Sequence, residues 1–572
     1  MKQSKPVVIP DVKGKIVLQK TATGTFVRYE YDRVYDRQKK YNVPVRATVG
    51  KVCADDSSMM YPNQNFMKYF PDVEIPGTEE RTTRSSCLRI GTYAVISKIV
   101  DESGLRQMLS SVFDGSESDT GMFIDLAAYS IICEDNAGQY YPDYAYNHPL
   151  FTPTMHVYSD SKVSDFLSGI THDHSSSFLG RWNECREDKD KIYISYDSTN
   201  KNTRAGDIDM AEYGHAKVNE GSRIFNYAIA YDCLNRDPLF YEAYCGSIVD
   251  VAQLQYMVEK AAGYGYRNTG FIFDRGYFSR LNLKYMDKRG FDFIIMVKGC
   301  KPFISELVLR HRGTFETSRQ HAITDYHAYG MTTTGRLYDD DDRDRFFHIY
   351  YSASRCAAER EQLESSLDET RHHLERHIGK QITRAESLAK YYDVVTEDKE
   401  GRTVLKSFSE KENVIEREIN LCGYYVIISA KEHTASDALH LYKGRDASEK
   451  LYRGDKSYLG DKSMRVYSDE SHAAKIFIEF VALIIRNRIY TALKDEMKRL
   501  DKKRNFMTVP AAIKELEKIE LTRQLDCVYR LDHAVTATQK AILKAFGMTD
   551  EDIKKEAKKI SQVLSDNQNI GA

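Results

Sequence analysis

The sequence predicts an α/β protein in which a mixed β-sheet is flanked by helices and interrupted by a long insertion. Between residues 189 and 302, apolar runs of strand length alternate with helical patterns. A stripe of charged and aromatic residues near position 449 follows these strand patterns only after a gap much longer than a compact connection needs. The total of 572 residues also exceeds one hydrophobic core, and at ~150 residues per domain it predicts three or four domains.

Composition narrows the classes of protein. The formal charge is only −2, so any contact with nucleic acid requires local basic patches. The ten cysteines form no C-x-x-C pair, which argues against a disulfide framework and a cysteine zinc site. The first residues contain no apolar leader, and the longest apolar run, 476–485, is broken by Glu479. We therefore expect a cytoplasmic protein with no membrane partner.

Changes in pattern along the chain indicate six segments. The first combines strand alternation with arginines and tyrosines, which is typical either of a sheet lying on a phosphate backbone or of a merely amphipathic sheet. The predicted segments are a β-rich basic region at 1–86, a helical region for DNA-end binding at 87–188, the first part of the core at 189–302, an insertion at 303–424, the second part of the core at 425–500, and a helical tail at 501–572.

Within the core, three strand patterns are followed by two helix-and-strand units. The strands are expected at 191–197, 223–232, 238–247, 269–274 and 292–298, with helices at about 248–266 and 277–287. A meander followed by right-handed crossovers would give a mixed sheet. If the first crossover returns beside the first strand, Asp197 and Asp274 stand at the carboxyl ends of adjacent parallel strands.

Each aspartate has an ordinary alternative, since an Asp after a strand is usually a turn former or a helix cap. Two neighbouring carboxylates would repel each other unless a cation lay between them. Oxygen ligands without His or Cys favour Mg²⁺, with Mn²⁺ as a substitute, over zinc.

Residues 441–456 carry the third candidate carboxylate. Tyr442, Arg445, Glu449 and Lys456 fall on one stripe of a predicted helix. The stripe is either a salt-bridged surface or a face that presents Glu449 to a two-metal site. In the second case, Arg445 and Lys456 hold backbone phosphates and Tyr442 packs on a sugar or base.

These residues resemble one large group of bacterial insertion-sequence DDE transposases, which share a Tyr-Arg-Glu-Lys signature. The blocks YDSTN (196–200) and FDRGYFS (273–279) are similar to the first and second acidic motifs of that group. The chain resembles the subset with a long insertion before the Glu. The resemblance implies an RNase H-like core and two Mg²⁺ ions on the catalytic residues Asp197, Asp274 and Glu449. It also implies element ends and target DNA as double-stranded partners, and a homodimer on DNA.

The remaining candidates surround this predicted site. Thr199, Arg275 and Lys298 are expected to orient it or contact phosphates. Because Glu449 follows Asp274 by 175 positions, residues of about 303–424 are expected to leave the sheet and return. The apolar helix at 471–504 is expected to pack on the sheet. Two alternatives stay open, namely a catalytically silent DNA-binding protein and an RNase H-like nuclease that cuts without joining.

Overall fold

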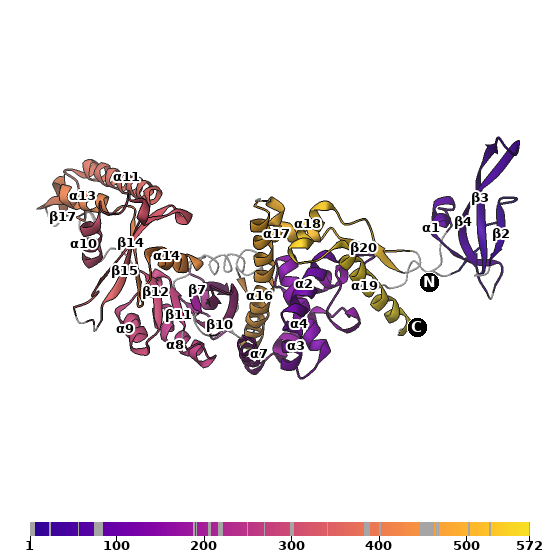
Figure 1. The fold of residues 1–572 in the computed structure, drawn as a ribbon, viewed down its shortest axis with the longest axis horizontal. Coiled ribbons are helices and arrows are strands. Elements are labelled where there is room, and N and C mark those ends of the chain that lie inside the picture. The colour runs from indigo at the N-terminus through magenta and orange to yellow at the C-terminus, as the bar shows by residue number, and fades with distance from the viewer. Residues whose placement is uncertain are drawn as a thin grey trace. The chain divides into compact units, whose positions relative to one another are not determined.

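A computed structural model describes most of the chain (Figure 1). The residues outside the description are 1–5, 22–23, 55, 74–83, 187–188, 190–191, 204–207, 215–220, 249, 268, 298–301, 340, 342, 383–388, 400–401, 446–462, 465, 467, 502–503, 525–527 and 571–572. The chain divides into two compact units. Unit 1 comprises 1–181, 204–208 and 453–572, and unit 2 comprises 182–203 and 209–452.

Unit 1 begins with an antiparallel sheet in the order β1-β5-β4-β3-β2. Its strands are β1 (Val7–Val8), β2 (Ile16–Thr21), β3 (Gly24–Asp36), β4 (Tyr41–Val52) and β5 (Met59–Pro62). Helix α1 (Gln64–Tyr69) closes one face, where Val27, Val49, Met60 and Phe66 are buried together. These strands lie within the segment 1–86, for which the sequence predicted strand alternation.

The rest of unit 1 is mainly helical. Its helices are α2 (Gly91–Glu102), α3 (Leu105–Val112), α4 (Glu117–Cys133), α5 (Tyr141–Asn147), α6 (Asp160–Gly169), α7 (His172–Glu184), α16 (Asp469–Arg499), α17 (Val509–Leu516), α18 (Ala537–Ala545) and α19 (Asp550–Ile570). The last three residues of α7 belong to unit 2. Strands β6 (Cys87–Arg89), β20 (Glu520–Arg523) and β21 (Tyr529–Leu531) form a small sheet, and β19 spans Ser463–Met464. No helix in the described part of the chain is long and apolar enough to cross a membrane.

Helix α16 packs within unit 1 against α2, α4 and α6. The ring of Phe477 lies 4.6 Å from that of Phe123 and 5.2 Å from that of Phe178. The helix is buried on several sides along its first half, which explains its nearly continuous apolar sequence. The helix predicted to pack on the sheet thus belongs to the same unit as the helices of 87–181 and the C-terminal tail.

Unit 2 is built on a mixed sheet in the order β10-β9-β7-β11-β12-β18-β15-β14-β13, with β8 beside β9. The strands are β7 (Tyr193–Thr203), β8 (Glu212–Tyr213), β9 (Arg223–Asp232), β10 (Asp237–Cys245), β11 (Gly270–Phe273), β12 (Asp292–Met296), β13 (Ala322–Ile323), β14 (Ala328–Gly335), β15 (Arg345–Tyr351) and β18 (Tyr424–Ser429). Strand β11 is parallel to both β7 and β12, and helices α8 (Asp250–Gly263) and α9 (Arg280–Arg289) make the crossovers. The predicted meander followed by crossovers is confirmed.

The prediction that residues 303–424 leave the sheet was wrong for the first half of that segment. Strand β15 pairs with β18 over six successive residue pairs, from Phe346↔Ser429 to Tyr351↔Tyr424, and β14 and β13 extend the sheet further. Helix α10 (Pro302–His311) precedes these strands. The apolar sequence of β15 and β18 explains the extension, because each buries side chains against the core.

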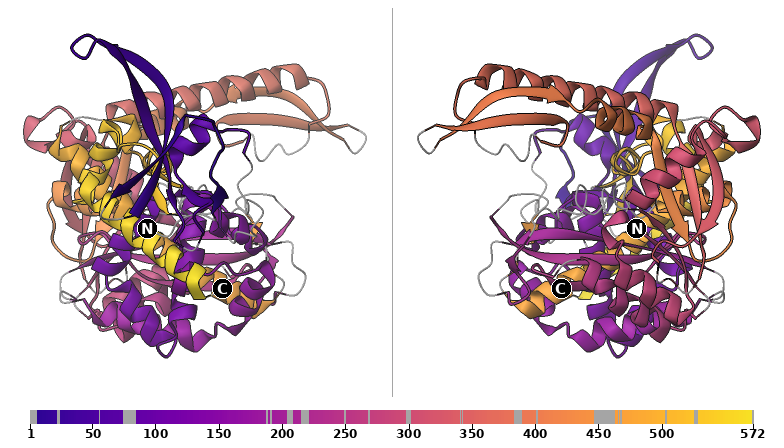
Figure 2. Two further views of the ribbon diagram at one scale, coloured as in Figure 1. Left: turned by 90° about the vertical axis from the view of Figure 1, so that its right-hand side faces the viewer. Right: turned by 90° about the vertical axis from the view of Figure 1, so that its left-hand side faces the viewer.

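An arm lies outside the sheet of unit 2. It consists of α11 (Ala353–His377), the hairpin of β16 (Tyr392–Lys399) and β17 (Arg402–Glu410), and α13 (Glu412–Leu421). Figure 2 shows α11 lying along the hairpin. Leu367, Leu374, Tyr392 and Leu405 form the core of the arm, and the exposed face of α11 is charged.

One side-chain contact fixes the three central strands in register. Tyr193, Gly270 and Asp292 occupy the same level of β7, β11 and β12. The Tyr193 hydroxyl donates to Asp292 Oδ2 at 2.8 Å, and its ring crosses directly over Gly270. His433 Nε2 lies 3.2 Å from the same Asp292 oxygen. Burial alone would raise the pKa of Asp292, but the hydrogen bonds from His433 and Tyr193 bring it below its usual value.

Replacing Gly270 with Ala tests this contact. The new Cβ would overlap the Tyr193 ring, which would have to leave Asp292. We expect the free energy of unfolding to fall by ~1–3 kcal/mol in denaturant titrations followed by circular dichroism. Gly263→Ala is the matched control, since its Cβ would meet nothing within 4 Å. Equal losses in the two variants would contradict the contact.

Candidate active site

Asp197 and Asp274 are neighbours on parallel strands. Tyr196 of β7 is the register partner of Phe273 of β11, and in each strand the next residue is the aspartate. Because adjacent strands lie ~4.8 Å apart and register partners share a face, the two carboxylates project side by side. Both residues are half-buried. The structure therefore creates the pair of like charges that the sequence raised as a possibility.

Asp274 also caps the short 3₁₀ helix η3 (Arg275–Tyr277). Its Oδ1 accepts the backbone N–H of Arg275 at 2.7 Å, while Asp197 Oδ1 accepts that of Ser198 at 2.9 Å. Capping and a site at the end of a strand were alternatives in the sequence. In the structure the same residue caps the helix and stands at the end of strand β11, so the cap fixes where the carboxylate lies.

Arg445 provides a cation at this position. Helix α14 (Ala435–Gly444) packs over β12, β14, β15 and β18, and Arg445 follows its last residue. Arg445 Nη1 lies 2.8 Å from Asp274 Oδ1. The Arg445 side chain is 12% exposed and that of Asp274 is 37% exposed. A guanidinium thus compensates the charge of Asp274 at the end of β11.

Tyr442 lies in the core, whereas the sequence assigned it to a sugar or base. It is 5% exposed and packs with Ile272, Ile294 and Leu439. The Arg445 guanidinium lies 5.3 Å from the centre of its ring. The helical stripe therefore directs Tyr442 towards the sheet, where its ring packs against the Arg445 guanidinium.

The other predicted residues fall into two groups. Thr199 is 5% exposed on the same face of β7 as Asp197, and Arg275 is exposed beside Asp274. Glu449, Lys456 and Lys298 lie outside the described residues. Within the described ranges, no group of three or more His, Cys, Asp or Glu side chains could hold a metal ion. The described part of the site thus offers two carboxylates, whose hard oxygens suit a magnesium-type cation.

Sequence reasoning missed Lys201. It lies on the same face of β7 as Asp197 and Thr199 and is only 1% exposed. Its Nζ lies 4.5 Å from the centre of the Tyr227 ring on β9. The strand was expected to end at 197, but β7 continues to Thr203 through polar residues that have no apolar alternation. A run of buried polar residues leaves no strand signal in the sequence.

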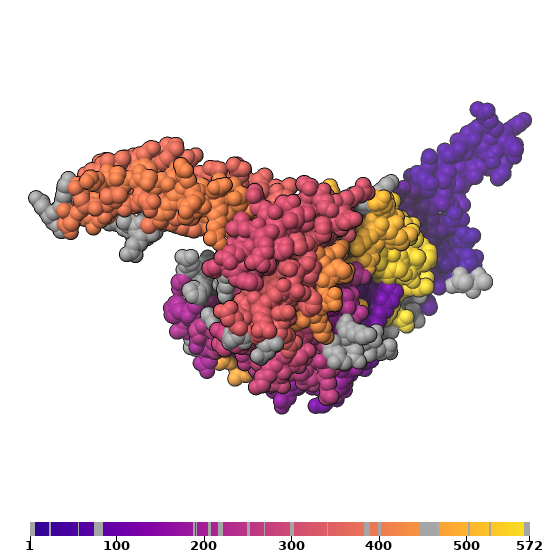
Figure 3. All heavy atoms as spheres, turned by 60° about the vertical axis from the view of Figure 1, so that its left-hand side comes forward, coloured from indigo at the N-terminus to yellow at the C-terminus, as the bar shows by residue number. Residues whose placement is uncertain are grey.

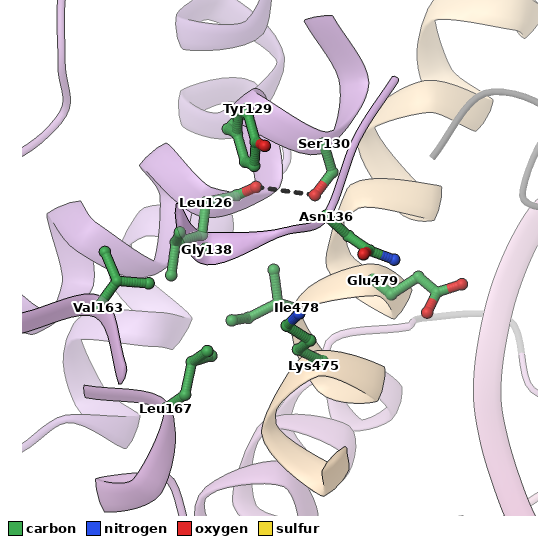
Figure 4. Close-up of a pocket in the computed structure, with 10 residues that line it drawn as sticks. All are labelled: Leu126, Tyr129, Ser130, Asn136, Gly138, Val163, Leu167, Lys475, Ile478 and Glu479. Carbon is green, nitrogen blue, oxygen red and sulfur yellow. Dashed lines mark hydrogen bonds between the residues drawn. The ribbon is translucent and has the colours of Figure 1, made fainter. Parts of the chain in front are cut away.

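A small cavity in unit 1 is separate from this pair of aspartates. It measures about 30 Å³ and lies between α4 and α16 (Figure 4). Ser130, Lys475 and Glu479 are among its lining residues. Its volume is enough for about one water molecule, so it is too small for a substrate.

The segment that contains these elements matches a known protein family. Residues 189–485 match the family described as transposase DDE domain. No curated protein matches the chain in sequence. Among solved structures, a cryo-EM structure of the piggyBac transposase synaptic complex with hairpin DNA is similar at 9% identity and a TM-score of 0.31. That similarity covers 62% of this chain and 57% of the piggyBac transposase chain, which is less than two thirds of its length.

The ion pair of Arg445 with Asp274 predicts competition with divalent cations. In Arg445→Gln the two aspartates lose their guanidinium, so a metal ion meets less competition. We expect Mn²⁺ to bind about five-fold more tightly, corresponding to the ~1 kcal/mol of a partly exposed ion pair. Calorimetric titration of the full chain measures this affinity.

Arg275→Gln is the matched control for this titration, because it removes an exposed arginine adjacent to the same aspartate. Its Mn²⁺ affinity should stay close to that of the wild type. Competition by Arg445 is excluded if Arg445→Gln binds Mn²⁺ no more tightly than Arg275→Gln does.

Proposed function

We propose that this chain, which belongs to the family of transposases with a DDE domain, is the DNA transposase of a bacterial insertion sequence. The observation that carries the proposal is the in-register pair of Asp197 and Asp274 with Arg445 beside it. Asp274 follows the carboxyl end of β11, where open α/β sheets bind their ligands, and Asp197 stands beside it in the middle of β7. The Tyr-Arg-Glu-Lys signature supports the assignment to the insertion-sequence subgroup, which would act on DNA in the bacterial cytoplasm.

The proposed metal ligands are Asp197, Asp274 and Glu449. Two Mg²⁺ ions, or Mn²⁺ in their place, would supply Lewis-acid stabilisation of the attacking and leaving oxygens in an in-line phosphoryl displacement. The described donors fit this chemistry, because both are carboxylates and lie on neighbouring strands. The RNase H-like description of the core belongs to the same proposal, supported by the mixed order of the sheet.

The protein groups position the DNA strand for two successive reactions. Water attacks the phosphodiester at an element end and breaks the bond to the 3′ oxygen, which leaves as a 3′-OH. That 3′-OH then attacks a phosphodiester of target DNA and displaces a new 3′-OH there. Arg445 and Lys456 would hold the phosphates of the reacting strand, with Tyr442 fixing the direction of Arg445. Thr199, Arg275 and Lys298 are proposed as flanking contacts.

The proposal extends to the assembly. Two element ends have to be cut together, which favours a homodimer on double-stranded DNA. The basic N-terminal region and the helical region after it are proposed to bind the terminal repeats. We retain the six segments predicted from the sequence as our proposal for the domains of the chain and their roles.

Charge-removing substitutions test the carboxylates. We expect Glu449→Gln and Asp274→Asn each to lower cleavage by at least ~10³-fold while duplex binding stays within about two-fold, because electrostatic stabilisation is lost and phosphate contacts remain. The substrate is duplex DNA from the ends of the element that encodes the chain. Cleavage at the wild-type rate in either variant would refute the assignment. Joining of the cut ends to a target plasmid by the wild type separates a transposase from a nuclease.

A thiol substitution tests direct metal ligation. Asp274→Cys replaces a hard oxygen with a softer sulfur, so we expect no cleavage with Mg²⁺ and partial recovery with Mn²⁺. Asp325→Cys is the matched control, since Asp325 is an exposed carboxylate paired with His440. It should cleave with both metals. Failure of Mn²⁺ to restore Asp274→Cys, with Asp325→Cys active, would argue against Asp274 as a ligand.

A further inference from the structure

The hairpin of β3 and β4 continues beyond the sheet to which it belongs. Strand β2 pairs with β3 as far as Tyr29, and β5 pairs with β4 from Gly50 onwards. Residues 30–36 and 41–46 pair with each other as a two-stranded extension that turns at 37–40. We call residues 30–46 the ribbon. Figure 3 shows it as a narrow extension of the N-terminal sheet.

Both faces of the ribbon carry exposed apolar or aromatic side chains. Val34 and Tyr41 share one face, and Tyr35 lies on the other, according to the strand register. Their exposed fractions are 56%, 58% and 58%. Exposed apolar side chains on edge strands promote aggregation. We therefore expect polar side chains at these positions in a ribbon that binds no partner.

The ribbon is basic although the whole chain is not. It carries five cations, namely Arg33, Arg37, Lys39, Lys40 and Arg46, against the acidic residues Glu30, Asp32 and Asp36, whereas the chain has a formal charge of −2. Asp36 shapes the turn, since its Oδ1 accepts the N–H groups of Gln38 at 2.9 Å and Lys39 at 3.2 Å. The turn thus presents Arg37, Lys39 and Lys40 together at the tip, all exposed.

The base of the ribbon is held rigidly. Glu30 is 4% exposed and accepts hydrogen bonds from Arg33 Nε at 2.6 Å and Arg46 Nη2 at 3.1 Å. The Tyr31 ring stacks on Tyr69 of α1 with 5.0 Å between centres. A ribbon fixed in this way loses little conformational entropy when it binds a partner.

We infer that the ribbon enters the major groove of duplex DNA. A two-stranded β-ribbon fits the width of that groove, and apolar side chains there can contact thymine methyl groups. Arg37, Lys39 and Lys40 at the tip would neutralise phosphates, and the face that carries Val34 and Tyr41 would contact base edges. The inference rests on the proposed function, because the duplex is the DNA on which the aspartates act.

The experiment measures duplex binding by the full chain without divalent metal, so that no DNA is cut. Fluorescence anisotropy with a 30-base-pair element-end duplex gives the dissociation constant at several salt concentrations. We expect Lys39→Gln/Lys40→Gln to weaken binding about ten-fold and to reduce the salt slope by about two. Tyr35→Ala/Tyr41→Ala should weaken binding with the slope unchanged, since no charge is lost.

Lys555→Gln/Lys559→Gln is the matched control, because it removes two lysines that are 79% and 65% exposed on α19. It should bind as the wild type does. Thermal unfolding of every variant should match that of the wild type, since all substituted side chains are exposed. A ribbon double variant that binds as tightly as this control overturns the inference.

Protection of guanine N7 from methylation tests the groove, because N7 lies in the major groove. The wild type should protect guanines that the tyrosine variant leaves reactive. Identical protection by both would overturn the groove assignment, and so would tighter wild-type binding to single-stranded DNA. If the wild type binds no duplex at all, the proposed function is refuted as well. If the ribbon substitutions leave duplex binding unchanged, only the role of the ribbon is refuted.

Discussion

The register between β7 and β11 is the constraint on which the site depends. A shift of one residue would turn one aspartate to the opposite face of the sheet and separate the carboxylates. Tyr193 prevents such a shift by reaching over Gly270 to Asp292, so a single side chain joins three strands. This contact lies at the start of β7 and β11, whereas Asp197 lies in the middle of β7 and Asp274 directly follows β11. The strands transmit the alignment from one level to the other because their pairing is continuous.

The second constraint is electrostatic, since two adjacent carboxylates require a nearby cation. Arg445 supplies it from a part of the chain far from both aspartates in sequence. The apolar face of α14 makes this possible, because Leu439 and Tyr442 bury against the sheet and fix the end of the helix. The hydrophobic core therefore determines where the guanidinium lies. A cation on an exposed loop would spend much of its time in solvent, whereas Arg445 is held close to Asp274.

The sequence was sufficient for those parts of the fold that depend on local pattern. The apolar runs before Asp197 and Asp274 and the helix between them identified two parallel strands, and the structure has them as neighbours. It was insufficient where burial is decided by distant partners. Nothing local marks β15 as a partner of β18, and α16 has the same apolar sequence whether it covers a sheet or fills a helical unit. Tyr442 was misplaced for the same reason, because helical spacing gives a stripe but not the direction it faces.

The pairing of β15 with β18 has one more consequence. Tyr351 and Tyr424 are register partners, so the arm between them departs from and returns to a single point of the sheet. The arm has its own core around Leu374 and Tyr392. Structurally it is an elaborate loop on an antiparallel hairpin, and a short turn could join the same two strands. A change in the length of the arm would therefore leave the pairing of β7 with β11, and with it the two aspartates, in place.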